Sequence, residues 1–285
     1  MKITNNQKAG ILAQALPNIQ KYRNKIVVVK YGGNAMINEE LKSAVMSDLV
    51  LLNTIGIKIV LVHGGGPEIS KMLNQLQIES KFVDGLRVTD KESADVVQMV
   101  LAGKINKNLT CQIGNSGGKA IGLSGLDGKM LECKKLDDKH GFVGEIINCN
   151  AEIIIDTIKS GFIPVISSIG FDKDSNTYNI NADTVASEIA SKIGAEALIS
   201  MTDTIGLLKN INDESTLINE VFVSDCPKLI ADGIISGGMI PKIDSMINAI
   251  RQGVKKAFII DGRVKHSILI ELLTDEGMGT MFRGR

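Results

Sequence analysis

The sequence has few cysteines, and none lies in a pattern typical of metal binding or a redox pair. Cys111, Cys133, Cys149 and Cys226 form no CxxC pair and lack the spacing of a zinc site. The chain has no run of about eighteen apolar residues and no basic N-terminal segment followed by an apolar one. We therefore expect reduced thiols, no metal site built from side chains, and a soluble, cytoplasmic protein.

An excess of charge of either sign is also missing. Lys plus Arg and Asp plus Glu each number 32, so the formal net charge is zero. No overall field favours nucleic acid or an anionic membrane, and we expect neither as a partner. Nor is there a GxxxxGK[ST] or a GxGxxG motif, which counts against a P-loop enzyme and a classical dehydrogenase.

The sequence does contain apolar runs that alternate with amphipathic segments along all 285 residues. This alternation predicts an α/β fold with a mainly parallel sheet covered by helices on both faces. The expected strands are 26–30, 58–62, 120–123, 162–168, 197–201 and 257–260. The expected helices are 39–52, 68–76, 91–102, 153–159, 184–193 and 243–251.

The first expected strand ends in a lysine followed by two glycines, Lys30, Gly32 and Gly33. Ligands of open α/β sheets bind at the carboxyl ends of strands, where an ammonium group can hold phosphate. The alternative is that Lys30 merely leaves the core and reaches solvent. The segment alone favours neither interpretation.

The second expected strand ends in His63-Gly64-Gly65-Gly66-Pro67 and continues as a helix. Bare backbone N–H groups and the helix dipole make this arrangement typical of an anion site. Pro67 suits a first helical turn. A tight turn without a ligand is the alternative, but three consecutive glycines are costly in unfolded-state entropy for a turn alone.

Polar residues in the second half of the chain also indicate a site at the carboxyl ends of the strands. Asn179, Asn181 and Asp183 alternate, so they share a face if the segment is extended; Asp183 alternatively caps the next helix. Lys242 lies near the start of a helix, where the dipole disfavours positive charge and an anion is therefore expected.

The segment 82–90 predicts an exposed hairpin. Arg87 is a candidate carboxylate clamp within it, although an arginine in a hairpin is more often simply solvated. Thr89 is expected to be the N-cap of the helix 91–102.

Before the first strand, Leu12, Ala15, Leu16 and Ile19 recur at helical spacing. Pro17 is expected to kink this helix or to end its first half. Such an apolar stripe needs a partner surface, either its own core or another subunit.

Several glycine loops, two lysines and an aspartate at strand ends suit phosphoryl transfer, in which the protein positions groups and neutralises charge. A carboxylate acceptor needs no general base, since a carboxyl group with a pKa of about 4.3 is already ionised at pH 7. Lysines, Mg²⁺ and backbone N–H groups would offset the repulsion between two anions.

These motifs resemble, in identity and order, those of the amino acid kinase family: VVVKYGGNAM, LVHGGGPEI, DGLRVTD, VLAGKINK, YNINADT and SGGMIPK. The resemblance covers nearly the whole chain. It implies an αβα sandwich and an ATP-dependent kinase, with Mg²⁺ held mainly through the nucleotide phosphates. Within the family, the motifs are most similar to the arginine-biosynthesis enzymes that phosphorylate the side-chain carboxylate of N-acetyl-L-glutamate.

The resemblance also implies roles for single residues. Lys30 and Lys242 would stabilise the transition state, and Asp183 would orient both lysines. The N–H groups of Gly65 and Gly66 would face the reacting carboxylate. Arg87 and Asn179 would hold the other end of the acceptor. The nucleotide side would be lined by Gly32, Gly33, Asp203, Gly206, Gly237 and Gly238, although Met201-Thr202-Asp203-Thr204 departs from the family's usual Leu-Thr-Asp-Val.

The resemblance implies three segments: an oligomerisation helix (1–24), an acceptor lobe (25–172) and an ATP lobe with an effector segment (173–285). It further implies a homo-hexamer assembled as a trimer of dimers, and feedback inhibition by L-arginine. The effector residues would be His266, Glu271, Gly277 and Gly279. Asn18 stands where arginine-sensitive members usually have a tyrosine.

Overall fold

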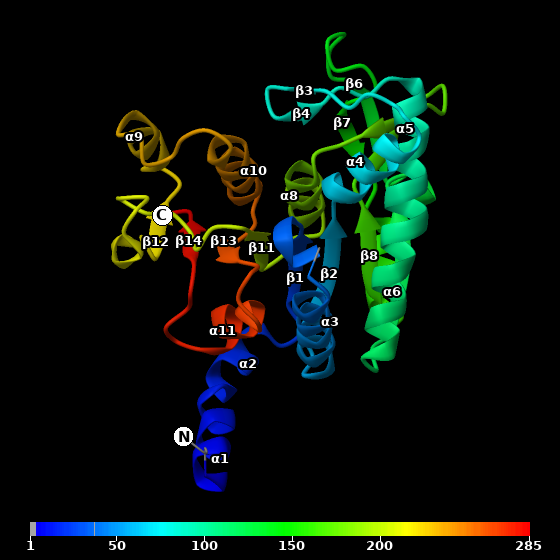
Figure 1. Cartoon of the computed structure of the whole chain (residues 1–285). Coiled ribbons are helices and arrows are strands. Elements are labelled where there is room, and N and C mark those ends of the chain that lie inside the picture. The colour runs from blue at the N-terminus through cyan, green and yellow to red at the C-terminus, as the bar shows by residue number, and fades with distance from the viewer. Residues whose placement is uncertain (1–3, 37) are drawn as a thin grey trace.

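An eight-stranded sheet lies at the centre of the computed structural model, which describes residues 4–36 and 38–285 (Figure 1). Six neighbouring strands are parallel, and they are the six that the sequence predicts. β14 is antiparallel to β13 and parallel to β12, so these two strands run opposite to the others. In sheet order the strands are β12 (Glu220–Phe222), β14 (Thr280–Arg283), β13 (Lys256–Asp261), β11 (Ala197–Thr202), β1 (Ile26–Tyr31), β2 (Lys58–His63), β8 (Ile163–Ser167) and β5 (Ala120–Ser124).

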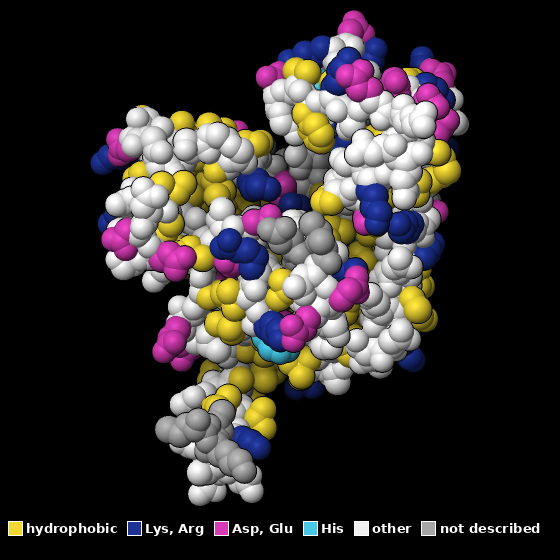
Figure 2. Space-filling model, viewed as in Figure 1, with side chains coloured by type: hydrophobic (Ala, Val, Ile, Leu, Met, Phe, Trp, Pro, Cys, Tyr) yellow, Lys and Arg dark blue, Asp and Glu magenta, His cyan; other side chains and the backbone are white. Residues whose placement is uncertain are grey.

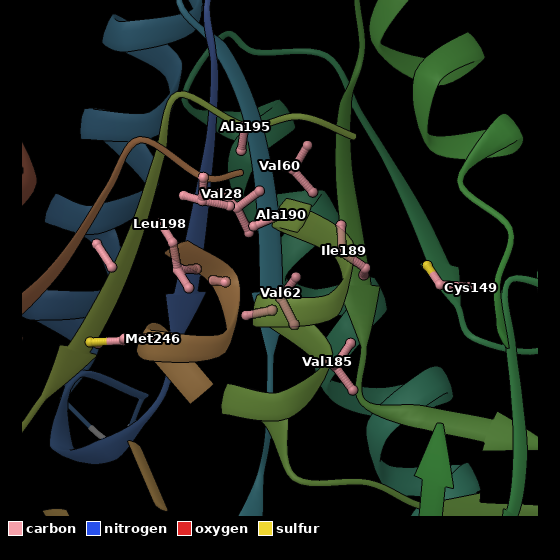
Figure 3. Close-up of a cluster of buried hydrophobic side chains, with 14 of the residues drawn as sticks. Val28, Val60, Val62, Cys149, Val185, Ile189, Ala190, Ala195, Leu198 and Met246 are labelled. Carbon is pink, nitrogen blue, oxygen red and sulfur yellow. The ribbon is translucent and has the colours of Figure 1, made fainter. Parts of the chain in front are cut away.

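Helices cover both faces of this sheet, because successive side chains of each buried strand point to opposite sides. Val27 and Val29 of β1 join one apolar cluster, whereas Val28 joins the other. Figure 3 shows Val28 in the second cluster, together with side chains of β2 and α8. The first face carries α3 (Glu39–Thr54), α4 (Gly66–Gln75), α5 (Lys91–Gln98), η2 (Met99–Ile105), α6 (Asn106–Asn115) and α11 (Ser267–Leu273); the second carries α7 (Glu152–Lys159), α8 (Ala182–Lys192), α9 (Cys226–Ala231) and α10 (Met239–Arg251). The predicted three-layer αβα architecture is confirmed.

Two small sheets lie beside the main one. The hairpin of β3 (Phe82–Val83) and β4 (Leu86–Arg87) forms as predicted. A four-stranded sheet has the order β10 (Thr177–Asn179), β9 (Ile169–Phe171), β6 (Leu131–Lys135) and β7 (Gly144–Cys149). Short helical turns are η1 (Gly33–Met36), η3 (Asp127–Lys129) and η4 (Glu214–Thr216). The division of the chain at residues 172 and 173 stays a prediction; it falls in the turn between β9 and β10.

The N-terminal segment forms two helices, α1 (Asn5–Gln14) and α2 (Leu16–Tyr22), separated at Ala15. Pro17 occupies the first turn of α2, so the expected interruption by this proline is confirmed. Tyr22 is buried, whereas no residue of α1 is, and α1 projects from the body of the molecule (Figure 1). Residues 1–3 of this expected segment lie outside the described residues.

The helix expected over 91–102 begins at Lys91 as predicted, but its N-cap and its C-terminal end differ from the prediction. Its N-cap is Asp90, whose Oδ1 accepts from the Ser93 N–H at 2.8 Å, so the choice of Thr89 is wrong. Thr89 is instead buried, and its hydroxyl donates to the Arg87 carbonyl. Beyond Gln98 the helix continues through the π-helical η2 into α6 and ends at Asn115. A π-turn of this kind is rare and frequently marks a functional site.

All four cysteines are free thiols, as expected. Within residues 4–36 and 38–285, no helix combines the length and apolar character needed to cross a membrane.

Candidate active site

A pocket opens at the carboxyl ends of the central parallel strands, and the face shown in Figure 2 is hollowed there, with basic and acidic side chains inside the hollow. Its walls come from β1, the β2–α4 loop, the β3–β4 hairpin, and β10 with the start of α8. Because parallel strands end at the same edge, residues far apart in sequence meet there. All the acceptor-side candidates but Lys242 line it: Lys30, Gly65, Gly66, Arg87, Asn179 and Asp183.

Two lysines converge on one aspartate in this pocket. Lys30 Nζ lies 3.1 Å from Asp183 Oδ2, and Lys242 Nζ lies 3.4 Å from the same oxygen. The Ser200 hydroxyl donates to the other oxygen, Asp183 Oδ1, at 2.9 Å. The side chains of Lys30 and Asp183 are each 9% exposed and that of Lys242 is 32% exposed, so Lys242 is the more accessible cation. The structure thus rules out the interpretation that Lys30 reaches solvent.

The electrostatics of this cluster keep the carboxylate ionised. Burial opposes ionisation of Asp183, but the charges of Lys30 and Lys242 and the hydrogen bonds to it outweigh burial and lower its pKa. Burial also lowers the pKa of Lys30, as does the charge of Lys242, whereas Asp183 acts in the opposite direction. A carboxylate kept ionised between two ammonium groups is suited to orienting them.

Asp183 does not cap α8, which settles the alternative left open by the sequence. The cap is Asn181, whose Oδ1 accepts from the Asp183 N–H at 2.8 Å. Asn179, Asn181 and Asp183 all line the pocket, as the alternation predicted. They do not lie on one extended segment, however, because β10 ends at Asn179 and Asp183 belongs to α8, which begins at Ala182.

The glycine loop after β2 leads directly into α4, with Pro67 in the first helical turn as predicted. All three glycine carbonyls are engaged within the protein. The Gly64 oxygen lies 2.9 Å from His63 Nδ1, the Gly65 oxygen accepts from the Ile69 N–H at 3.0 Å, and the Gly66 oxygen accepts from Arg87 Nη2 at 3.0 Å. The loop is therefore held from the protein side while Gly64, Gly65 and Gly66 line the pocket.

Arg87 is buried, so the interpretation of a solvated hairpin arginine is wrong. Its guanidinium donates to the hydroxyls of Ser80 and of Ser70, the latter at 2.8 Å, and stacks against the Phe82 ring. These bonds and the bond to Gly66 use three of the five guanidinium donors. The remaining donors of the Arg87 guanidinium can bind an anionic ligand in the pocket.

A second pocket lies next to the start of α10 and is lined by Gly206 together with Thr204, Leu208, Asn210, Ser236 and Met239. Gly237 and Gly238 sit between two of its lining residues. Asp203 lies closer to the first pocket, because a Cβ atom on Gly33 would come within 2.5 Å of Asp203 Oδ1. The nucleotide-side candidates therefore divide between the two pockets. Helix α10 joins them, since it starts at Met239 and carries Lys242 to Asp183.

The effector-segment candidates lie in or next to α11 and in the tail that follows it, and none of the four lines either pocket. Glu271 Oε2 accepts from the N–H groups of Met278 and Gly279 at 2.9 and 3.1 Å. Gly277 has a φ of 61°, which lets the tail fold back over Glu271. His266 Nδ1 lies 2.6 Å from Asp48 Oδ1.

Sequence reasoning missed four residues that support the site: Ser70 and Ser200, which bond its charged groups, and His63 and Asn106, which lie behind the glycine loop. His63 lies inside the motif LVHGGGPEI and Asn106 inside VLAGKINK, but neither residue was given a role there. The serines carry no local signal, because their partners are distant in sequence.

The fold and the site together define an α/β protein with a pocket at the carboxyl edge of a parallel sheet, lined by Lys30, Arg87 and a glycine loop. The chain belongs to the amino acid kinase family, whose family model matches residues 25–261. The resemblance inferred from the motifs is thereby confirmed.

Similar curated proteins cover the chain almost completely. An acetylglutamate kinase of Brachyspira hyodysenteriae is 55% identical over 282 residues, which are 98% of each chain. One of Clostridium beijerinckii is 54% identical over 98% of this chain and 99% of its own. One of Prochlorococcus marinus is 48% identical over 98% of this chain and 92% of its own.

Solved structures share the fold at low sequence identity. N-acetylglutamate synthase from Neisseria gonorrhoeae, complexed with coenzyme A and N-acetyl-glutamate, superposes with a TM-score of 0.85 at 22% identity, over 97% of this chain and 63% of that one. Carbamate kinase from Giardia lamblia bound to AMP-PNP gives a TM-score of 0.68 at 17% identity, over 92% and 99%.

Proposed function

We propose that this chain transfers the γ-phosphoryl group of ATP to the side-chain carboxylate of N-acetyl-L-glutamate, a step of arginine biosynthesis. The observation that carries the proposal is the cluster of Lys30, Asp183 and Lys242 at the junction of the two pockets. The names of the curated relatives, at about half identity over nearly full length, support the same acceptor.

The first pocket suits a dicarboxylate acceptor. Arg87 and Asn179 lie on its wall and provide a cation and an amide for one end of the ligand. The glycine loop and Lys30 lie where the other carboxylate would react. Such a pocket fixes a small anionic molecule at both ends, which is how positioning lowers the barrier of a bimolecular reaction.

The chemistry needs charge neutralisation more than proton transfer. The attacking carboxylate is ionised at pH 7, so no base has to remove a proton. Lys30 and Lys242 neutralise the charge that the transferring phosphoryl group carries between the two anions. Asp183 holds both ammonium groups in place, and the Gly65 and Gly66 N–H groups hold the attacking carboxylate.

Mg²⁺ is proposed to enter with the nucleotide. In the described part of the chain no three His, Cys, Asp or Glu side chains come together as a metal site. This fits a Mg²⁺ ion that is held mainly through phosphate oxygens and water. When bound, the ion would neutralise phosphate charge alongside the two lysines.

A hydroxamate assay with glutamate, acetylglutamate, aspartate and carbamate tests the proposal directly, because acyl phosphates react with hydroxylamine. We expect product chiefly with acetylglutamate. Product with another acceptor alone would assign the chain to a different member of its family. Absence of turnover with every acceptor would indicate a regulatory protein that keeps the fold without catalysis.

Replacing Arg87 by alanine should raise the KM for the acceptor roughly 10- to 100-fold, since a hydrogen-bonded charge contact is worth about 1.5–3 kcal/mol. The KM for ATP and kcat should change much less. Lys81→Ala is the matched control, because it removes an exposed cation beside the same hairpin. An unchanged acceptor KM in Arg87→Ala would remove Arg87 from the acceptor site.

We further propose that the chain forms a hexamer of interlaced dimers through α1. Ile11, Leu12 and Leu16 are exposed, at 56%, 74% and 52%, and α1 buries none of its residues on its own subunit. An apolar surface of this kind usually meets a partner.

Deleting residues 1–20 should therefore convert a hexamer into a dimer in sedimentation velocity. Leu12→Glu should act in the same direction, because it would place a charge in the contact, whereas Gln14→Glu puts the same charge at a polar position of α1 and serves as control. A full-length chain that sediments as a dimer, or an unchanged mass after deletion, would refute the interlacing.

Feedback inhibition by L-arginine is the third part of the proposal, at a site around α11. Asn18 of α2 donates to Asp275 Oδ1 at 3.1 Å, so the N-terminal helices and the tail after α11 are in contact. Glu271 offers a carboxylate for a guanidinium in fork geometry. Inhibition would be allosteric, with arginine coupled to a second conformation of the assembly.

Titrating the rate with arginine up to about the millimolar range should inhibit the wild type, and Glu271→Ala should raise the half-inhibitory concentration tenfold or more. Glu271→Gln is the informative partner variant. It keeps an oxygen for the Met278 and Gly279 N–H groups but removes the charge, so it should lose inhibition while keeping the tail in place. Deletion of residues 1–20 should also weaken inhibition. A wild-type rate indifferent to arginine would refute this part, and inhibition that survives all three changes would place the effector elsewhere.

A further inference from the structure

Behind the glycine loop, two polar side chains are buried completely. They are His63, the last residue of β2, and Asn106, the first residue of α6, both with 0% exposure. Asn106 Nδ2 lies 3.1 Å from His63 Nε2. The same nitrogen donates to the carbonyls of Leu123 at 3.0 Å and Val165 at 2.8 Å. Neither side chain lines the pocket, so neither can touch a ligand there.

The hydrogen-bond chemistry allows one arrangement of protons here. The two backbone carbonyls accept only, so Asn106 must turn its NH₂ group toward them. These two bonds use both hydrogens of the NH₂ group, so its contact with His63 Nε2 shares one of them; Nε2 must still be unprotonated, because an amide nitrogen does not accept a hydrogen bond. The Gly64 carbonyl accepts only, so the ring proton is on Nδ1, which donates to it at 2.9 Å. Burial lowers the pKa of His63 to about 4, against the effect of the Gly64 hydrogen bond, so the ring is neutral at pH 7.

The bond to the Gly64 carbonyl determines where the next N–H group points. A trans peptide is planar, with its C=O and the following N–H in opposite directions. Because the Gly64 oxygen is drawn toward the buried ring, the Gly65 N–H is directed away from it. The Gly64 N–H is itself bonded to the Tyr31 carbonyl of β1, at 3.4 Å, so the preceding His63–Gly64 peptide is also held.

The π-helical η2 packs against the same loop. A Cβ atom on Gly65 would lie 2.2 Å from Ile105 Cδ1 and 2.7 Å from Leu101 Cδ2, so a larger residue at this position would require these two side chains to shift. Asn106 follows η2 directly. Segment η2 thus fixes the position of the glycine loop through Leu101 and Ile105. Asn106, which follows η2, fixes the orientation of the loop.

We infer that Asn106 and His63 are positioning residues that orient the Gly64–Gly65 peptide, so that the Gly65 N–H is presented to the reacting anionic carboxylate. The inference rests on the proposed function for the identity of that carboxylate. The chain of contacts runs from Asn106 Nδ2 to His63 Nε2, and from His63 Nδ1 to the Gly64 oxygen. Neither side chain exchanges a proton during turnover.

Two substitutions of His63 separate positioning from packing. Asparagine places an amide nitrogen where histidine has Nδ1, so His63→Asn keeps the donor to Gly64. Glutamine reaches the place of Nε2, so His63→Gln keeps an acceptor for Asn106 and loses that donor. We expect kcat to fall about 10- to 100-fold in His63→Gln and in Asn106→Leu, with the KM for ATP within about twofold. His63→Asn should retain kcat within about fivefold. Thermal unfolding of each variant reports the structural cost separately.

The ring itself can be observed by ¹H–¹⁵N NMR, since the chain has three histidines and each is assignable by substitution. We expect a neutral Nδ1–H tautomer for His63 at pH 7, and a mixed tautomer in Asn106→Leu. Equal losses of kcat in His63→Asn and His63→Gln, or an Nε2–H or charged ring in the wild type, would overturn the inference. A wild type without turnover on acetylglutamate would refute the proposed function instead, and the tautomer would then decide the inference alone.

Discussion

Lys30→Met should lower kcat about 10³-fold, equivalent to about 4 kcal/mol of transition-state stabilisation, while the KM for the acceptor changes less than about fivefold. The ammonium group is 9% exposed and lies 3.1 Å from Asp183. A cation in such a dry site acts most strongly on the charge of the transferring phosphoryl group. An interaction made chiefly in the transition state appears in kcat and not in KM.

Steady-state kinetics with both substrates, combined with acceptor binding by calorimetry, measure this split. Lys25→Met is a suitable control, because Lys25 directly precedes β1, is exposed, and pairs only loosely with Glu196 at 3.7 Å. The control should be nearly wild type. If Lys30→Met changed acceptor affinity as much as kcat, Lys30 would be a binding residue and not a stabiliser of the transition state.

Asp183→Asn should lower both the stability of the fold and the catalytic rate. Removing the carboxylate leaves Lys30 buried without its counter-ion, so the free energy of unfolding should fall by about 3 kcal/mol or more. Catalysis should fall about 10²-fold or more, because neither lysine is then held in place. Ser200→Ala is the matched control, since it removes a hydrogen bond to Asp183 and keeps the charge.

The same variant should move the pH profile in a definite direction. Asp183 raises the pKa of Lys30 against the effects of burial and of Lys242, so its loss should lower that pKa further. Lys30 is active as the ammonium form, and this form would then disappear at a lower pH. The alkaline limb of the kcat–pH profile should therefore shift toward acid in Asp183→Asn, with part of the activity recovered as the pH is lowered. An alkaline limb that stays in place would exclude Lys30 as the titrating group.

Much of the fold follows from local patterns. Buried strands such as β1 and β2 are continuous apolar runs, and the glycines that end them mark the edge where the pocket lies. The pairing of Lys30, Asp183 and Lys242 was inferred from family resemblance, and the structure places them in contact. Their catalytic roles remain predictions that the kinetic experiments address.

Other features depend on neighbours that the sequence does not identify. Thr89 and Asp90 are both good capping residues, and only tertiary contacts select between them. Thr89 forms a bridge with Gly141, far along the chain, which takes it into the interior and leaves the cap to Asp90. Arg87 is buried for a similar reason, since Ser70 and Gly66 of another helix supply its partners.

The sequence by itself determined the three layers, the parallel strands and the loops at the site, because hydrophobic periodicity and glycine act over a few residues. Only the tertiary structure decided the details that connect these parts: the π-helical turn at η2, the buried contact between His63 and Asn106, and the buried state of Arg87. A buried polar group must find its hydrogen-bond partners wherever the fold places them, and those partners are remote in sequence.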